Sequence, residues 1–218
     1  MENLYVILRL AHIAAGTTAL IVAPGAMLAV KGGLWHRRWG KVYFWAMAMV
    51  AMSAVVMTSV KPNIFLSMIA LFSFYLAFGG YRALYHKRPQ DGATTLDWTG
   101  LALMAIGSLG LIAWAAVELS RGATMGWVGV TFGLLGTSLA VRDVRDFWTP
   151  PEDGRAWLYK HMVGMLSAYI ATVSAFSVVN FQFMPPLVRW LWPSVIGSIG
   201  IALWVAHYGR GSGKIRGI

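Results

Sequence analysis

Seven long apolar runs, separated by short charged segments, constrain what this chain can fold into. They cover approximately residues 4–30, 42–60, 63–86, 98–120, 125–141, 158–182 and 187–209. A helix of about 20 apolar residues crosses the roughly 30 Å hydrocarbon core of a bilayer. The runs lack the period-two alternation that a membrane barrel requires, so helices are the remaining choice. The sequence therefore predicts an all-α integral membrane bundle of seven transmembrane helices, forming one domain over residues 1–218.

The composition agrees with a membrane environment and excludes several functions. Hydrophobic residues make up 58% of the 218-residue chain and charged residues 12%, against about 45–50% and about 25% in soluble domains. The net charge of +10 comes from loops beside apolar runs, where anionic lipid and topology explain it better than nucleic acid does. The chain has no cysteine. Thiolate catalysis, disulfides and cysteine metal sites are therefore excluded.

The distribution of basic residues predicts an orientation. Trp35, His36, Arg37 and Arg38 cannot share hydrocarbon, so we expect a short loop before residue 42 at one membrane surface. The first, third and fifth loops and the C-terminal tail hold most of the basic residues, namely Lys31, Arg37, Arg38, Lys41, Lys87, Arg88, Arg142, Arg145, Arg155, Lys160, Arg210, Lys214 and Arg216. The positive-inside rule then places the N-terminus outside and the C-terminus in the cytoplasm of a bacterial inner membrane.

Small residues recur at helical spacing in the fifth run, which is the shortest of the seven. Gly129, Gly133 and Gly136 form one face that allows close backbone approach. The approaching surface can be a neighbouring helix, a second copy of the chain or another membrane protein. A membrane scaffold is therefore one possible function.

Histidine placement is the most informative pattern after the apolar runs. His36, His86, His161 and His207 all fall at predicted cytoplasmic helix ends, and imidazole is a common ligand of haem and transition metals. A haem b held by two histidines needs both imidazoles at one depth, and His36 with His161, or His86 with His207, meets that condition. The alternative is an interfacial position without a ligand, which we prefer for His86 and His207.

Acidic residues add one candidate ligand. Asp97 opens the fourth predicted helix at the level of the histidines, and with His36 and His161 it could bind a divalent metal ion. The other acidic residues, Asp143 among them, lie in predicted loops and indicate solvated charges. No phosphate-binding loop or nucleophile elbow occurs, so whether the protein is an enzyme stays open.

A second group of polar residues lies near the middle of the membrane. His12 lies about 12 Å below the outer boundary, and Arg9 shares its predicted helix face. Tyr169 and Thr172 reach a similar depth from the opposite side. These four residues predict a substrate or proton path through a transporter or channel. The alternative is a neutral His12 bonded to a hydroxyl, with Arg9 paired to Glu118.

Three short motifs resemble a widespread family of bacterial polytopic membrane proteins known only as a domain of unknown function. They are Arg9-x-x-His12, Gly33-x-x-His36-Arg37-x-x-Gly40-x-x-Tyr43 and His161-x-x-x-Met165-x-x-x-Tyr169. The resemblance singles out His12, His36, Arg37, Gly40, Tyr43, His161 and Met165 without implying a role for them. Gly164 and Ser167 stand where the family often has Trp and Arg. The family's membrane histidines look like those of b-type cytochromes, which agrees with our leading hypothesis of electron transfer or metal handling.

Overall fold

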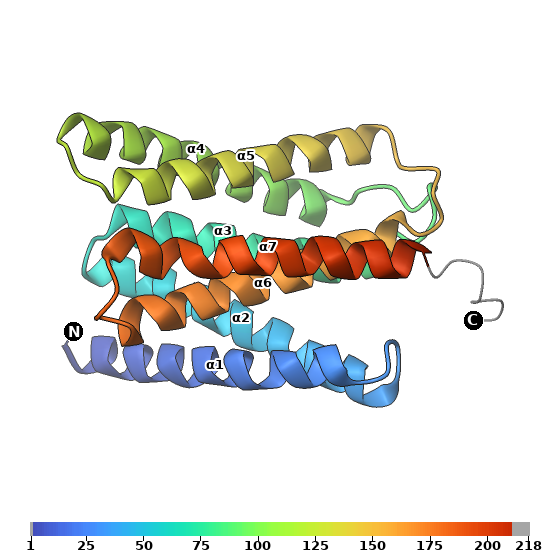
Figure 1. Cartoon of the computed structure of the whole chain (residues 1–218), viewed down its shortest axis with the longest axis horizontal. Coiled ribbons are helices and arrows are strands. Elements are labelled where there is room, and N and C mark those ends of the chain that lie inside the picture. Colours follow the sequence, from blue (N-terminus) through green and yellow to red (C-terminus); the bar gives the residue numbers. More distant parts are fainter. Residues whose placement is uncertain (1, 211–218) are drawn as a thin grey trace.

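The computed structural model describes residues 2–210 and contains seven long helices and no strand in that range (Figure 1). The helices are α1 (Glu2–Leu28), α2 (Leu34–Val60), α3 (Ile64–Arg82), α4 (Thr95–Ser120), α5 (Gly126–Trp148), α6 (Ala156–Asn180) and α7 (Pro186–Arg210), with a 3₁₀ turn, η1 (Ala83–Tyr85), after α3. Every helix except α5 is long and apolar enough to cross a membrane. The all-α prediction is confirmed for these residues, and the six apolar helices indicate a multi-pass membrane protein.

Two helix boundaries differ from the predicted ones. Helix α2 begins at Leu34, so the prediction of a loop before residue 42 is wrong, and only residues 29–33 connect α1 to α2. Gly32 makes the turn with a φ of 73°, a conformation that glycine adopts without steric cost. Helix α5 continues to Trp148, past the end of its apolar run. Hydrophobicity locates the hydrocarbon, whereas a helix can extend beyond it into the interface.

The helices alternate in direction, so all loops lie at the two ends of the bundle (Figure 1). We call the end that carries loops 29–33, 86–94 and 149–155 the basic end, and the other the opposite end. The α1–α2, α4–α5 and α6–α7 hairpins surround α3, which packs on α2, α4 and α6. Lys214 and Arg216 of the predicted basic tail lie outside the described residues.

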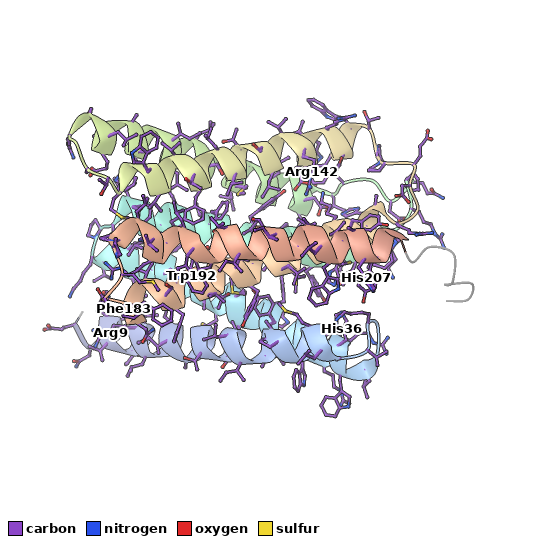
Figure 2. All side chains as sticks on the ribbon, in the orientation of Figure 1. Arg9, His36, Arg142, Phe183, Trp192 and His207 are labelled. Atoms are coloured by element: carbon purple, nitrogen blue, oxygen red, sulfur yellow. The ribbon has the colours of Figure 1, made fainter. Side chains whose placement is uncertain are left out.

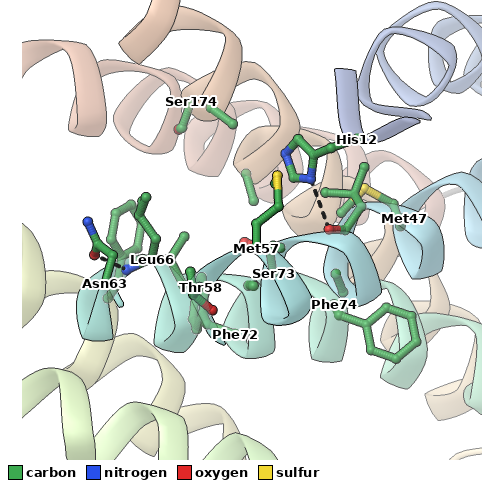
Figure 3. Close-up of a pocket in the computed structure, with 18 of the residues that line it drawn as sticks. His12, Met47, Met57, Thr58, Asn63, Leu66, Phe72, Ser73, Phe74 and Ser174 are labelled. Carbon is green, nitrogen blue, oxygen red and sulfur yellow. Dashed lines mark hydrogen bonds between the residues drawn. The ribbon is translucent and has the colours of Figure 1, made fainter. Parts of the chain in front are cut away.

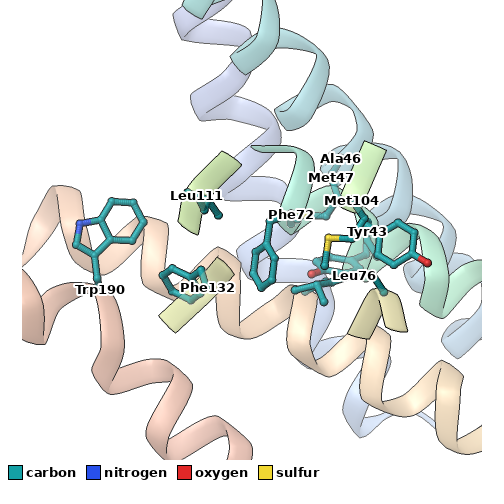
Figure 4. Close-up of a cluster of buried hydrophobic side chains, with 14 of the residues drawn as sticks. Tyr43, Ala46, Met47, Phe72, Leu76, Met104, Leu111, Phe132 and Trp190 are labelled. Carbon is teal, nitrogen blue, oxygen red and sulfur yellow. The ribbon is translucent and has the colours of Figure 1, made fainter. Parts of the chain in front are cut away.

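The core is a row of apolar side chains that runs along the bundle between the hairpins (Figure 4). It includes Tyr43, Met47, Phe72, Leu76, Met104, Leu111, Phe132 and Trp190. Many other large apolar side chains face outward, such as Trp45, Leu28 and Leu203. An apolar exterior of this extent would favour aggregation in water and suits contact with lipid.

The glycine face of α5 is covered by α4. A Cβ atom at Gly129 would lie 2.9 Å from the Cβ of Ala115, and one at Gly133 would lie 3.0 Å from the Ser108 carbonyl oxygen. The predicted close approach to a neighbouring helix is therefore confirmed, and the neighbour belongs to the same chain.

A second close crossing joins α3 to α6 at Gly80 and Gly164. A Cβ at Gly164 would lie 2.6 Å from the Gly80 Cα and 2.9 Å from the Leu76 carbonyl oxygen. Because these neighbours are backbone atoms, they cannot move aside without shifting a helix. This crossing fixes how the basic end of α6 lies on α3, and hence where His161 points.

We expect Gly164→Ala to lower the free energy of unfolding by about 1–3 kcal/mol, because the new methyl group forces α6 away from α3. Gly200→Ala in α7 is a matched control, since no heavy atom of residues 2–210 lies within 4 Å of a Cβ there. Thermal unfolding in detergent measures both variants. Equal unfolding temperatures for the two would contradict the tight crossing.

Candidate functional site

The structure brings two histidines from distant parts of the chain together at the basic end. His36 lies in the first turn of α2 and His161 in the second turn of α6. Their ring centres are 6.2 Å apart, and the ring planes meet at 76°. Both side chains are partly buried. Figure 2 shows His36 on the inner side of the α1–α2 hairpin near the basic end.

Each of these imidazoles is oriented by a backbone carbonyl at a helix C-terminus. His36 Nδ1 lies 2.9 Å from the Ala26 oxygen, and His161 Nδ1 lies 2.8 Å from the Gly80 oxygen. Ala26 and Gly80 belong to the last four residues of α1 and α3, where carbonyls lack a helical partner. Because a carbonyl only accepts, each Nδ1 donates, and the lone pair of the neutral ring is then at Nε2.

The backbones of α2 and α6 stay apart beside this pair. No Cα atom of α2 lies within 8 Å of one in α6 over their full described lengths, so side chains bridge the space between them. Gly40 lies one turn after His36, and no heavy atom among the described residues is within 4 Å of a Cβ placed there. The face of α2 that carries His36 therefore includes an open position.

Deeper in the same space, three side chains connect α2 to α6. The hydroxyl oxygens of Tyr43 and Thr172 are 3.5 Å apart, and the Thr172 hydroxyl donates to Met47 Sδ at 3.4 Å. Tyr169 packs against the core beside them. Thr172 and Tyr169, two members of the predicted path, therefore face Tyr43 and Met47. The helical rise per residue predicted the depth of Tyr169 and Thr172. It did not predict that they lie next to Tyr43 and Met47.

His12 is bonded within the bundle rather than to the other path residues. Its Nδ1 lies 3.1 Å from the Val50 carbonyl oxygen and 3.0 Å from the Ser53 hydroxyl oxygen, as in the alternative interpretation of His12. Arg9 is exposed, so the shared inward face predicted for it is wrong. Glu118 forms its ion pair with Arg121 at 3.2 Å, so the predicted Arg9–Glu118 pair is also wrong.

Asp97 stabilises the α3–α4 connection and lies away from the histidine pair. Its Oδ1 accepts from Arg82 Nε at 2.6 Å, and its Oδ2 accepts from Arg82 Nη2 at 2.8 Å and from the Thr94 amide at 2.8 Å. With 2% of its side chain exposed, it forms a capping box that starts α4. No group of three His, Asp or Glu that could hold a metal occurs in the described part of the chain. The predicted His36, His161 and Asp97 set is thus not assembled.

The other predicted histidine pair is not formed either. His86 Nδ1 lies 2.8 Å from the Asp91 carbonyl oxygen, and its Nε2 lies 3.2 Å from Asp97 Oδ2. His207 is exposed and contacts the ring of Tyr208. The two rings thus have separate neighbours, and the interfacial interpretation of both residues stays a prediction.

A buried acid beside the site escaped the sequence analysis. Asp143 is 3% exposed, accepts from the Tyr75 hydroxyl at 2.6 Å and lies 2.8 Å from Lys160 Nζ. It was expected to be a solvated loop charge, but α5 extends past residue 141 and turns Asp143 inward. Because Lys160 precedes His161, this interaction helps to fix the start of α6.

Comparisons with protein-family models, curated proteins and solved structures found no match to this chain. The resemblance to a family of bacterial membrane proteins stays a prediction.

We expect Asp97→Ala to lower the free energy of unfolding by about 3–5 kcal/mol, because the Arg82 guanidinium would lose its buried partner. If Asp97 is structural, the same variant keeps any iron or zinc that the wild-type protein carries. Thermal unfolding and elemental analysis on one preparation test both points. Loss of bound metal from a variant of unchanged stability would contradict this assignment.

Proposed function

We propose that this protein binds haem b between His36 and His161 and transfers electrons in a bacterial inner membrane. The observation that carries the proposal is the pair of imidazoles 6.2 Å apart, each with Nδ1 held by a carbonyl. Histidines that bind metals show this arrangement, because a bond at one ring nitrogen orients the other toward the metal. The proposal includes seven transmembrane helices, with the N-terminus outside and the basic end in the cytoplasm.

The number of protein ligands favours haem over a single metal ion. Structural zinc sites use four protein ligands and catalytic ones use three, whereas His36 and His161 supply two. Two axial ligands are sufficient for haem iron, since the macrocycle provides the others. A metal bound at about 2 Å by an imidazole nitrogen on each side puts the ring centres roughly 6 Å apart.

The surroundings of the pair also suit a haem. Gly40 leaves open space beside His36, and the wide separation of α2 and α6 suits a flat macrocycle. Arg37 and Lys41 lie at the same end of α2, where their positive charges would favour the propionates. A haem supplies one-electron redox chemistry when bound. His36 and His161 would hold it, with their rings oriented by the Ala26 and Gly80 carbonyls.

Replacing both His36 and His161 by asparagine distinguishes two roles of the imidazoles, bonding the helix C-terminal carbonyls and binding the haem iron. The asparagine amide can still donate to the Ala26 and Gly80 carbonyls but has no counterpart of Nε2. We expect the wild-type protein from a haem-producing host to show a Soret band and stoichiometric iron. The double variant should lose both by roughly tenfold or more while its unfolding temperature changes little.

His207→Asn is the matched control, because it removes an exposed imidazole from the same end of the bundle. It should keep the wild-type spectrum. A folded wild-type protein without haem or stoichiometric metal would refute the proposal. Stoichiometric zinc or copper in place of haem, lost in the double asparagine variant, would instead assign metal handling to the same pair.

We expect Gly40→Leu to lose most of the Soret band, because its side chain would occupy the space proposed for the macrocycle. Gly40→Ala adds one methyl group and should retain the band. The alanine variant should fold, since nothing beyond the local backbone of α2 lies within 4 Å of the added Cβ among the described residues, and the unfolding temperature of the leucine variant is measured alongside its spectrum. Absorbance per mole of protein after reconstitution with hemin measures the effect, and an unchanged band in the leucine variant would place the haem elsewhere.

A further inference from the structure

A cavity of about 410 Å³ lies between the helices, toward the opposite end of the bundle from the histidine pair (Figure 3). Its mouth is formed by the α2–α3 connection at Lys61, Pro62 and Asn63, and it reaches inward to His12 and Met47. Its volume falls within the range of about 300–1,000 Å³ that small-molecule sites occupy. It contains none of the residues of the proposed haem site.

Two polar groups on one side of the cavity are available to a ligand. Ser174 is 2% exposed, and its hydroxyl has no hydrogen-bond partner among the described residues. Because His12 Nδ1 is bonded to the Val50 carbonyl, its Nε2 remains available. In Figure 3, His12 and Ser174 lie across the cavity from the side chains of α2 and α3. A buried hydroxyl without a partner is costly, so a ligand oxygen there would be stabilising.

The walls favour a flat ring. Phe72, Phe132 and Trp190 line the cavity and form a row with ring centres 5.5 Å and 6.3 Å apart. All three are at least nine-tenths buried, so packing holds their faces in place. Aromatic walls of this kind bind planar rings by offset stacking or edge contacts.

A fatty acid suits the cavity less well. Its alkyl chain would lie against His12 and Ser174 and leave both polar groups without partners. Its carboxylate would have to remain at the mouth, where the Lys61 ammonium already lies 4.4 Å from the centre of the Tyr5 ring. A ligand that is apolar at its edges and carries oxygen at its inner end fits the distribution of polar groups better.

We propose that this cavity binds a quinone-class molecule in its reduced, quinol form, a planar ring with hydroxyl substituents, and that one ring hydroxyl donates to His12 Nε2 while its oxygen accepts from the Ser174 hydroxyl. An apolar tail on the ring could leave toward the mouth. The binding site does not depend on the haem proposed above, so failure of either proposal leaves the other testable.

Isothermal titration calorimetry with ubiquinone-1, reduced to its quinol form and kept anaerobic throughout, on the full chain in lipid nanodiscs, tests the site. Empty nanodiscs give the partition blank. We expect saturable binding, weakened about three- to tenfold by His12→Asn and similarly by Ser174→Ala, as expected for loss of one hydrogen bond each. Asparagine at position 12 can still donate to the Val50 carbonyl. Ser108→Ala removes a buried hydroxyl outside the cavity and should leave binding unchanged.

A cavity-filling variant keeps the test valid if the polar variants do not fold. Ala54 lines the cavity, and Ala54→Phe should abolish ubiquinol-1 binding without lowering the unfolding temperature. Decanoic acid and p-xylene are the comparison probes and should bind at least about tenfold more weakly than ubiquinol-1. Equal binding of either probe, or ubiquinol-1 binding that none of the three cavity variants changes, would overturn the proposal.

Discussion

Polar groups inside an apolar bundle must find partners within the chain, and this requirement places most of the functional candidates. The carbonyls of Ala26 and Gly80 near helix ends receive imidazole donors from His36 and His161. The carboxylate of Asp97 is satisfied by Arg82 and Thr94. Because these groups are wholly or partly buried, each such bond replaces a bond to solvent and is costly to remove. Histidines that cap helices thereby become fixed in orientation, which is also what ligation requires.

Close and wide helix contacts divide the molecule into supporting and functional regions. Glycines allow α5 to lie directly on α4 and α6 to cross α3 at Gly80 and Gly164, so these contacts leave no room for a ligand. Between α2 and α6 the backbones stay apart, and side chains such as Tyr43 fill part of the space. The α3–α6 crossing therefore positions His161 beside His36, with their ring centres 6.2 Å apart.

The two proposed sites lie toward different ends of the bundle, and contacting side chains extend from the cavity as far as Tyr43. Met47 lines the cavity and accepts a hydrogen bond from Thr172, whose hydroxyl also lies beside that of Tyr43. Tyr43 is two turns along α2 from His36. The polar residues around Thr172 therefore lie between the proposed haem site and the proposed ligand cavity. From the sequence alone, the same residues suggested a transport path.

The sequence by itself determined that the chain is built of long apolar helices, because apolar length and helical rise per residue are local properties. It placed His36, His86, His161 and His207 at one level and favoured the first and third as ligands, but it could not show which rings lie next to each other. It also missed the burial of Asp143. Only the tertiary structure decided these points, because the rotation of each helix and its choice of neighbours depend on packing between distant segments. Gly80 and Gly164 are an example. They lie in opposite halves of the chain, and the crossing that they form sets the direction of His161.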